Sequence, residues 1–163
     1  MNPYASYLGT QDPIHVLSTT PSRLEEIAAS LGESGVNQRL IPGKWSAREI
    51  LIHLADCEVA FAFRYRQGLA EDHHVIQPFN QEKWAQCYGA YAGREALRTY
   101  SALRQWNLAL IRSLTPEQMG RTLNHPERGD HSFRTLIETN AGHDINHLRQ
   151  LENLQVAAQH KPA

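Results

Sequence analysis

Hydrophobic residues recur every three or four positions along four long stretches of this chain, with polar residues between them. This spacing places them on one face of an α-helix and predicts amphipathic helices. Strand signals are almost absent, because no run alternates β-branched and polar residues and neither Asn-Gly nor Asp-Gly occurs. The pattern predicts an all-α fold, a four-helix bundle. We expect helices over about residues 13–31, 46–68, 94–114 and 132–156, with a short helix from Thr115 between the last two.

Several helix ends carry their own local signals. Ser46 followed by Glu49 has the pattern of a capping box, in which each side chain accepts a hydrogen bond from the backbone N–H of the other. Ser132 is expected to cap the last helix in the same way as Ser46 caps the second. Gly32 and Gly35 are expected to end the first helix.

Two connections lack helical periodicity. A connection as long as residues 70–92 is uncommon inside a compact domain unless it carries function or covers a site. The polar stretch 124–131 is expected to be a loop before the last helix. The histidines in these connections are expected to be solvated, although one at the mouth of the bundle could serve as an acid or base. They are His73, His74, His125 and His131.

Length and composition indicate a single domain over residues 1–163, with its core at about 13–156 and a flexible tail at 157–163. Lys and Arg total 16 against 17 for Asp and Glu, so the net charge of -1 offers nothing that would attract nucleic acid. Neither a membrane span nor a signal peptide is visible, so we expect no membrane partner. Two cysteines are too few for a disulfide framework and favour a cytoplasmic location.

The last predicted helix has polar residues where leucines would be expected. Its inward face includes Asn140, His143 and His147, and buried polar groups need partners. Because His143 and His147 are four residues apart, they share one face of the helix. His53 lies on the inward stripe of the second predicted helix, beside Ile50.

Three imidazoles on facing helices could hold a divalent metal on one side and leave coordination positions open on the other. Parallel and antiparallel packing both bring His53 to within about one turn of a partner histidine, so convergence is permitted. Three neutral ligands leave the charge of the metal uncompensated, which acidifies a bound water or thiol. Hydrolysis and thiol transfer therefore both stay open. The alternative is a set of core histidines, each with an ordinary hydrogen bond.

Further residues near these histidines are candidates for supporting roles. Asn140, Asp144 and Glu58 could orient the imidazoles through their other ring nitrogen. Cys57, one turn after His53, could be a fourth ligand or a small buried hydrophobe. The arginines that could bind a substrate carboxylate, although surface solvation is the simpler role, are Arg64, Arg66 and Arg149. The aromatic residues that could line a pocket or anchor the long connection are Phe79, Trp84 and Tyr88.

The chain resembles the DinB-like (DinB/YfiT) superfamily. The resemblance lies in GKWSAREILIHLADCE at 43–58, PFNQEKWA at 78–85 and HSFRTLIETNAGHDINHLRQL at 131–151. It implies an up-down-down-up bundle with a long crossover between helices two and three. It also implies a divalent metal (Zn, Ni, Fe or Mn) on His53, His143 and His147, and a homodimer.

Characterised members of that superfamily include transferases that use low-molecular-weight thiols. The resemblance therefore implies a metal-dependent S-transferase or hydrolase that acts on a small molecule, with such a thiol as a co-substrate of the transferase. The alternative is a non-catalytic, stress-related module whose metal is structural. An open metal site would favour catalysis, and a closed one would favour a structural role.

Overall fold

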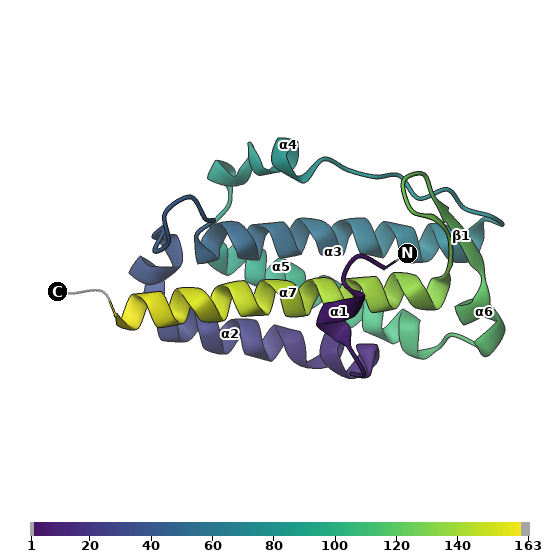
Figure 1. Cartoon of the computed structure of the whole chain (residues 1–163), viewed down its shortest axis with the longest axis horizontal. Coiled ribbons are helices and arrows are strands. Elements are labelled where there is room, and N and C mark those ends of the chain that lie inside the picture. The colour runs from purple at the N-terminus through teal and green to yellow at the C-terminus, as the bar shows by residue number, and fades with distance from the viewer. Residues whose placement is uncertain (1, 161–163) are drawn as a thin grey trace.

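Four long helices dominate the computed structural model, which describes residues 2–160. Two of them run in one direction and two in the other, in the order up-down-down-up (Figure 1). The predicted all-α class and bundle topology are confirmed. The four helices are α2 (Pro13–Asn37), α3 (Ala47–Ala70), α5 (Gly93–Arg112) and α7 (Phe133–Gln159).

The helices begin where their capping signals predict. The Ser46 hydroxyl accepts a hydrogen bond from the Glu49 backbone N–H (3.2 Å), and the Glu49 carboxylate accepts from the Ser46 N–H (2.8 Å). Ser132 caps α7 by accepting from Thr135 N–H. A second capping box at Thr115 starts α6 (Pro116–Gly120). Local side-chain chemistry therefore fixes these boundaries to within a residue.

Two helix ends differ from the prediction. At Gly32 the backbone leaves helical geometry (φ 65°, ψ 173°), as a glycine can, but the chain resumes a helical turn and α2 reaches Asn37. At the other end of the chain α7 continues to Gln159, so it includes the first residues of the predicted tail. His160 caps the end of α7, and residues 161–163 of the predicted tail lie outside the described residues.

A two-stranded hairpin, β1 (Thr122–His125) and β2 (Gly129–Ser132), occupies most of the stretch predicted to be a loop. The loop prediction was wrong there, because strands of four residues with one fully buried side chain, Leu123, leave almost no alternating signal. Gly129 adopts φ 73°, a left-handed conformation suited to a turn.

The long crossover returns along the outside of α3, so that α5 can run parallel to α3 (Figure 1). Its first part pairs with the hairpin, since Ile76 N–H donates to Asn124 O (2.8 Å). Its second part contains α4 (Gln81–Ala85) and the short 3-10 helix η1 (Tyr88–Ala90). The buried side chains of Ile76 and Tyr88 hold the crossover against the bundle.

The core consists of two hydrophobic clusters separated by a polar layer. One cluster includes Leu17, Tyr65 and Phe133, and the other includes Leu24 and Leu151. The buried residues of the polar layer are His53, Glu58, Arg104, Asn107, Asn140, His143, Asp144 and His147. Among the described helices, none combines the length and hydropathy needed to cross a membrane.

The short helix α1 (Ala5–Leu8) lies against α7 (Figure 1). The residue before it, Tyr4, sits directly on Gly142. A Cβ atom at position 142 would lie 2.5 Å from the Tyr4 carbonyl oxygen, so only glycine permits this approach. Through this contact the N-terminal segment is held above the polar layer.

Candidate metal centre

The structure brings the three predicted histidines together. The Nε2 atoms of His53 and His143 are 3.1 Å apart, and those of His143 and His147 are also 3.1 Å apart. All three side chains are buried. Helix α3 supplies the first, and successive turns of α7 supply the other two, as their i, i+4 spacing requires.

Burial also sets the protonation of the three imidazoles. Desolvation, with a contribution from His147, lowers the pKa of His53 to about 3. Desolvation lowers the pKa of His147 to about 4 and that of His143 well below its usual value. The rings are therefore neutral at pH 7, and neutral imidazole is the form that binds a metal.

The spacing of the nitrogens fits a shared divalent cation. Metal–nitrogen bonds of about 2.0–2.1 Å place neighbouring ligand nitrogens about 3.0 Å apart in octahedral and about 3.4 Å apart in tetrahedral geometry. The 3.1 Å separations fall within that range. The buried Nδ1 of His143 has no hydrogen-bond partner, so the polar contacts of this ring all lie on its Nε2 side. One ligand atom each of His53, Cys57 and His143 lies within 4.8 Å of the other two, and His147 Nε2 adjoins this group through His143, so the donor set fits a metal.

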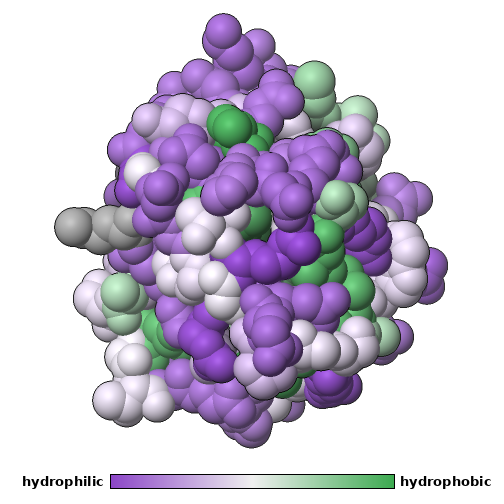
Figure 2. All heavy atoms as spheres, turned by 90° about the vertical axis from the view of Figure 1, so that its right-hand side faces the viewer, coloured by the Kyte–Doolittle hydropathy of each residue, from purple (hydrophilic) through white to green (hydrophobic). Residues whose placement is uncertain are grey.

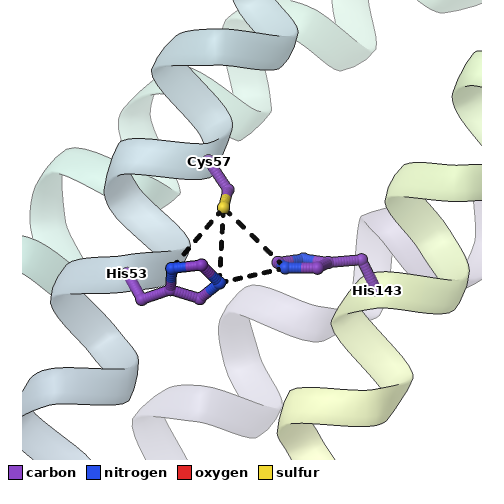
Figure 3. A group of neighbouring side chains, drawn as sticks. All are labelled: His53, Cys57 and His143. Atoms are coloured by element: carbon purple, nitrogen blue, oxygen red, sulfur yellow. Dashed lines mark hydrogen bonds between the residues drawn. The ribbon is translucent and has the colours of Figure 1, made fainter. Parts of the chain in front are cut away.

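Cys57 points into the same space as His53 and His143 (Figure 3). Its Sγ lies 3.4 Å from His53 Nε2 and 3.8 Å from His143 Nε2. Burial raises the pKa of the thiol far above its usual value, so it is protonated in the absence of a cation. The structure therefore offers a possible fourth ligand beside the three imidazoles.

The outer ring nitrogens have partners that the sequence analysis did not assign. Tyr88 OH lies 3.4 Å from His53 Nδ1, and Gln150 Oε1 lies 3.1 Å from His147 Nδ1. Gln150 follows His147 by three residues, and that helical spacing could have identified it. Tyr88 comes from the crossover, and nothing local in the sequence indicates which imidazole it reaches.

The three residues expected to orient the imidazoles have a different role. Glu58, Asn140 and Asp144 all contact the buried guanidinium of Arg104, and none of their described hydrogen bonds reaches an imidazole. Arg104 Nε and Nη2 donate to the two Glu58 oxygens at 3.0 and 2.7 Å. Further donors to the carboxylates are Asn107 for Glu58 and Tyr100 for Asp144.

Sequence reasoning missed Arg104, although it falls on the inward stripe of α5, four residues after the buried Tyr100. Burial would raise the pKa of Glu58, but its bidentate pair with Arg104 holds that pKa below the usual value. Burial prevails at Asp144 and raises its pKa despite the same guanidinium. The cluster joins α3, α5 and α7 immediately behind the histidines and thereby fixes their relative positions.

Two cavities meet at the histidines. The first, about 210 Å³, is lined by His53, Cys57 and His143 and extends toward the hairpin. The second, about 770 Å³, is lined by His147 and by Trp45. Tyr4 and Gln81 contribute to both cavities. The Tyr4 ring also makes an edge contact with His143, with 5.2 Å between ring centroids.

Several candidates from the loops fall near the first cavity. His125 and His131, which were expected to be solvated, line it, and the former is buried. Phe79 also lines it and packs against Trp84 with the two rings tilted by 31° and their centroids 4.5 Å apart. Trp84 is 39% exposed. His74 instead pairs with Glu71 outside the cavity, with 2.6 Å between Nδ1 and a carboxylate oxygen.

Comparison with known proteins finds one matching family. A sequence model of the DinB superfamily matches residues 17–151, which include all three histidines. A protein of Oceanobacillus iheyensis named "Putative metal-dependent hydrolase" is 29% identical over 142 residues, which is 86% of this chain and 83% of that protein. A protein of Halalkalibacterium halodurans with the same description is 25% identical over 85% of this chain and 82% of its own length.

A solved structure has the same fold. YfiT from Bacillus subtilis, described as "a probable metal-dependent hydrolase with an unusual four-helix bundle topology", superimposes with a TM-score of 0.80. The two share 23% sequence identity, and the match covers 87% of this chain and 83% of YfiT. The bundle architecture is therefore shared at low sequence identity.

Proposed function

This chain belongs to the DinB superfamily, and from that premise we propose that it is a metal-dependent hydrolase of a small molecule. His53, His143 and His147 bind the divalent metal. The observation that carries the proposal is the position of His143, whose buried Nε2 lies 3.1 Å from the Nε2 of His53 and 3.1 Å from that of His147. The first cavity is lined by His53 and His143, and the second by His147. The names of the relatives support the reaction class.

The imidazoles would bind the metal, and the residues around them would orient the rings. A divalent metal on three neutral imidazoles lowers the pKa of water and polarises a substrate carbonyl, which is the chemistry hydrolysis needs. Tyr88 and Gln150 hold the outer nitrogens of His53 and His147 and so fix the ring orientations. Tyr4 packs over His143 and lines both cavities, so its ring borders each approach to the centre.

The first test is elemental analysis of metal in untagged protein. We expect close to one equivalent of Zn, Ni, Fe or Mn in the wild type and less than a tenth of that in His143→Ala. The matched control is His15→Ala, an exposed histidine on α2, which should retain full occupancy. Equal metal content in all three proteins, or no metal in any, would contradict the proposed ligand set.

A structural metal is the competing interpretation, and Cys57 decides between the two. If its sulfur is a fourth ligand, the site is a closed tetrahedron of the structural type. Three histidines alone leave room for water and substrate. We expect Cys57→Ala to keep its metal, and metal-dependent cleavage of p-nitrophenyl acetate to depend on His143. Loss of metal from Cys57→Ala, as complete as from His143→Ala, would assign the metal to a structural role.

Thiol transfer is the second candidate, because two separate cavities reach the imidazoles from different sides. Two approaches would allow two substrates to reach the metal together, and a bound metal acidifies a thiol as well as water. Glutathione and bacillithiol, offered with monochlorobimane as acceptor, would test it. A rate that needs both the thiol and the bound metal favours transfer, and a rate indifferent to the thiol leaves hydrolysis.

A further inference from the structure

The first cavity carries an excess of positive charge along its length. Arg64 and Arg128 line it, against a single carboxylate, that of the exposed Glu127. His125 and His131 complete the polar part of the wall, and burial lowers the pKa of both, so they add hydrogen-bonding capacity rather than charge. The hairpin end of the bundle shows strongly hydrophilic residues beside hydrophobic ones (Figure 2). An anionic ligand is the complement of such a wall.

Arg64 differs from other buried charges because no carboxylate of residues 2–160 pairs with it. Its guanidinium is half-buried and donates to the Gln77 carbonyl oxygen at 3.0 Å. Within the described part of the chain, none of the ion pairs found within 4.0 Å includes Arg64. The fully buried Arg104, in contrast, has two carboxylates. Desolvation, reinforced by the charge of Arg128, lowers the pKa of Arg64. A bound anion would relieve this cost.

Two aromatic rings hold the guanidinium in place. Arg64 Cζ lies 5.6 Å from the ring centroids of both Phe61 and Phe79, within the range of cation–π contacts. Those contacts and the Gln77 carbonyl use only part of the five-donor fork of an arginine. The remaining N–H groups are available to a planar or tetrahedral oxyanion, which arginine binds with two parallel hydrogen bonds.

The distance between Arg64 and the metal centre sets the length of a ligand that would reach both. Cys57, Phe61 and Arg64 lie on one stripe of α3, all of them lining the cavity. Seven residues of helix separate Cys57 from Arg64, which is about 10 Å along the axis. The lining of the same cavity includes the apolar side chains of Phe61, Phe79 and Leu136.

We propose that Arg64 forms an anion subsite, which holds the carboxylate or phosphate group of the substrate while its apolar middle crosses Phe61 and its reactive bond reaches the imidazoles. The substrate class is therefore a short organic acid or phosphate ester with an apolar segment. One part of this inference rests on the proposed function: that the end of the substrate near the imidazoles, away from Arg64, is the end that reacts. The anion subsite itself depends only on the cavity.

Calorimetric titration of metal-free protein with phenylacetate, phenyl phosphate and neutral phenylacetamide tests the subsite without any turnover. We expect one or both anions to bind and the amide to bind at least tenfold more weakly. Arg64→Gln should weaken the anion at least tenfold, the loss expected for one charge-assisted pair, and Arg64→Lys should restore part of it. Arg98→Gln, an exposed arginine on α5, is the control and should bind as the wild type. The stronger of the two anions identifies the natural group.

Three outcomes would overturn the subsite: no binding of either anion, equal binding of the amide, or an Arg64→Gln affinity within twofold of the wild type. Metal analysis of the same proteins as purified, before the metal is removed for the titration, separates this failure from that of the proposed function. Full metal with an indifferent Arg64→Gln refutes the subsite alone. Anion binding that depends on Arg64 in a protein that takes up no metal refutes the metal-dependent reaction and leaves the subsite.

Discussion

Arg104→Met would leave the carboxylates of Glu58 and Asp144 in the protein interior without their cation. All three side chains are about 1% exposed, so water cannot replace the lost partner. The guanidinium also donates to the Leu17 carbonyl oxygen at 3.2 Å, and this acceptor would be left without that donor. Methionine matches the length of the arginine stem but supplies neither charge nor donors.

The expected cost follows from breaking a buried ion pair by removing one partner, about 3–5 kcal/mol. An unfolding entropy of about 2.1 cal/mol/K per residue gives about 0.34 kcal/mol/K for a chain of 163 residues. The melting temperature of Arg104→Met should therefore fall by about 9–15 °C.

Thermal unfolding followed by circular dichroism at 222 nm measures this shift, with Arg98→Met as the matched control. Arg98 lies on the same helix but is exposed, so its replacement should change the stability by less than about 0.5 kcal/mol. Protonation of Glu58 or Asp144 would reduce the loss of stability in the variant, so the measurement is made at pH 8, where protonation is least favoured. A fall of less than about 3 °C for Arg104→Met would refute the assignment of the polar layer to this ion-pair network.

Three further predictions follow from other contacts. Burial raises the pKa of Glu49, but the hydrogen bond from Arg39 opposes burial and helps to hold that pKa at about 2, against 4.5 in the unfolded chain. Glu49 therefore stabilises the fold above about pH 4.5, and this effect declines as the pH falls toward 2. The advantage of the wild type over Glu49→Gln in urea unfolding, about 1–2 kcal/mol at pH 6, should shrink to a small fraction of that by pH 2. A difference that stays constant would contradict this prediction. Gly142→Ala should displace Tyr4 and cost about 1–3 kcal/mol in the same assay, whereas Gly120→Ala, with open space around it, should be close to neutral; equal effects would exclude the close approach. Chelation of the metal should leave the helical circular dichroism intact, because hydrophobic clusters flank the centre on both sides; an unfolded metal-free chain would favour a structural metal.

The parts of this structure that sequence could predict are those set by short-range physics. Ser46 and Glu49 determine the start of α3 within four residues, and His143 and His147 share a face because they belong to one helix. The spacing of hydrophobic residues predicted where the helices lie in the sequence but not which helices pack against one another. Their direction in the bundle came from the family resemblance, since the periodicity of a helix does not state which neighbour it faces.

The missed features depend on contacts between distant segments. Glu58 follows His53 by five residues, so the two side chains differ in direction by about 140° around α3, and Glu58 meets α5 instead of the imidazoles. Its partner Arg104 is 46 residues away, and no local rule pairs them. The hairpin was missed because its strands are too short to show alternation, and its other support is distant, since Asn124 accepts a hydrogen bond from Ile76 of the crossover.

The separation of His53 and His143 by 90 positions has a consequence for how the protein acquires its centre. During synthesis the first imidazole leaves the ribosome well before the helix that carries the other two exists. Contacts between residues so far apart in sequence form late, because the entropy cost of closing a long loop comes before the contact contributes any stabilisation. A nascent chain that ends before α7 therefore has no centre, and the assembly of the three nitrogens coincides with the docking of that helix. Binding of the cation would then mark the moment at which α7 docks and folding is complete.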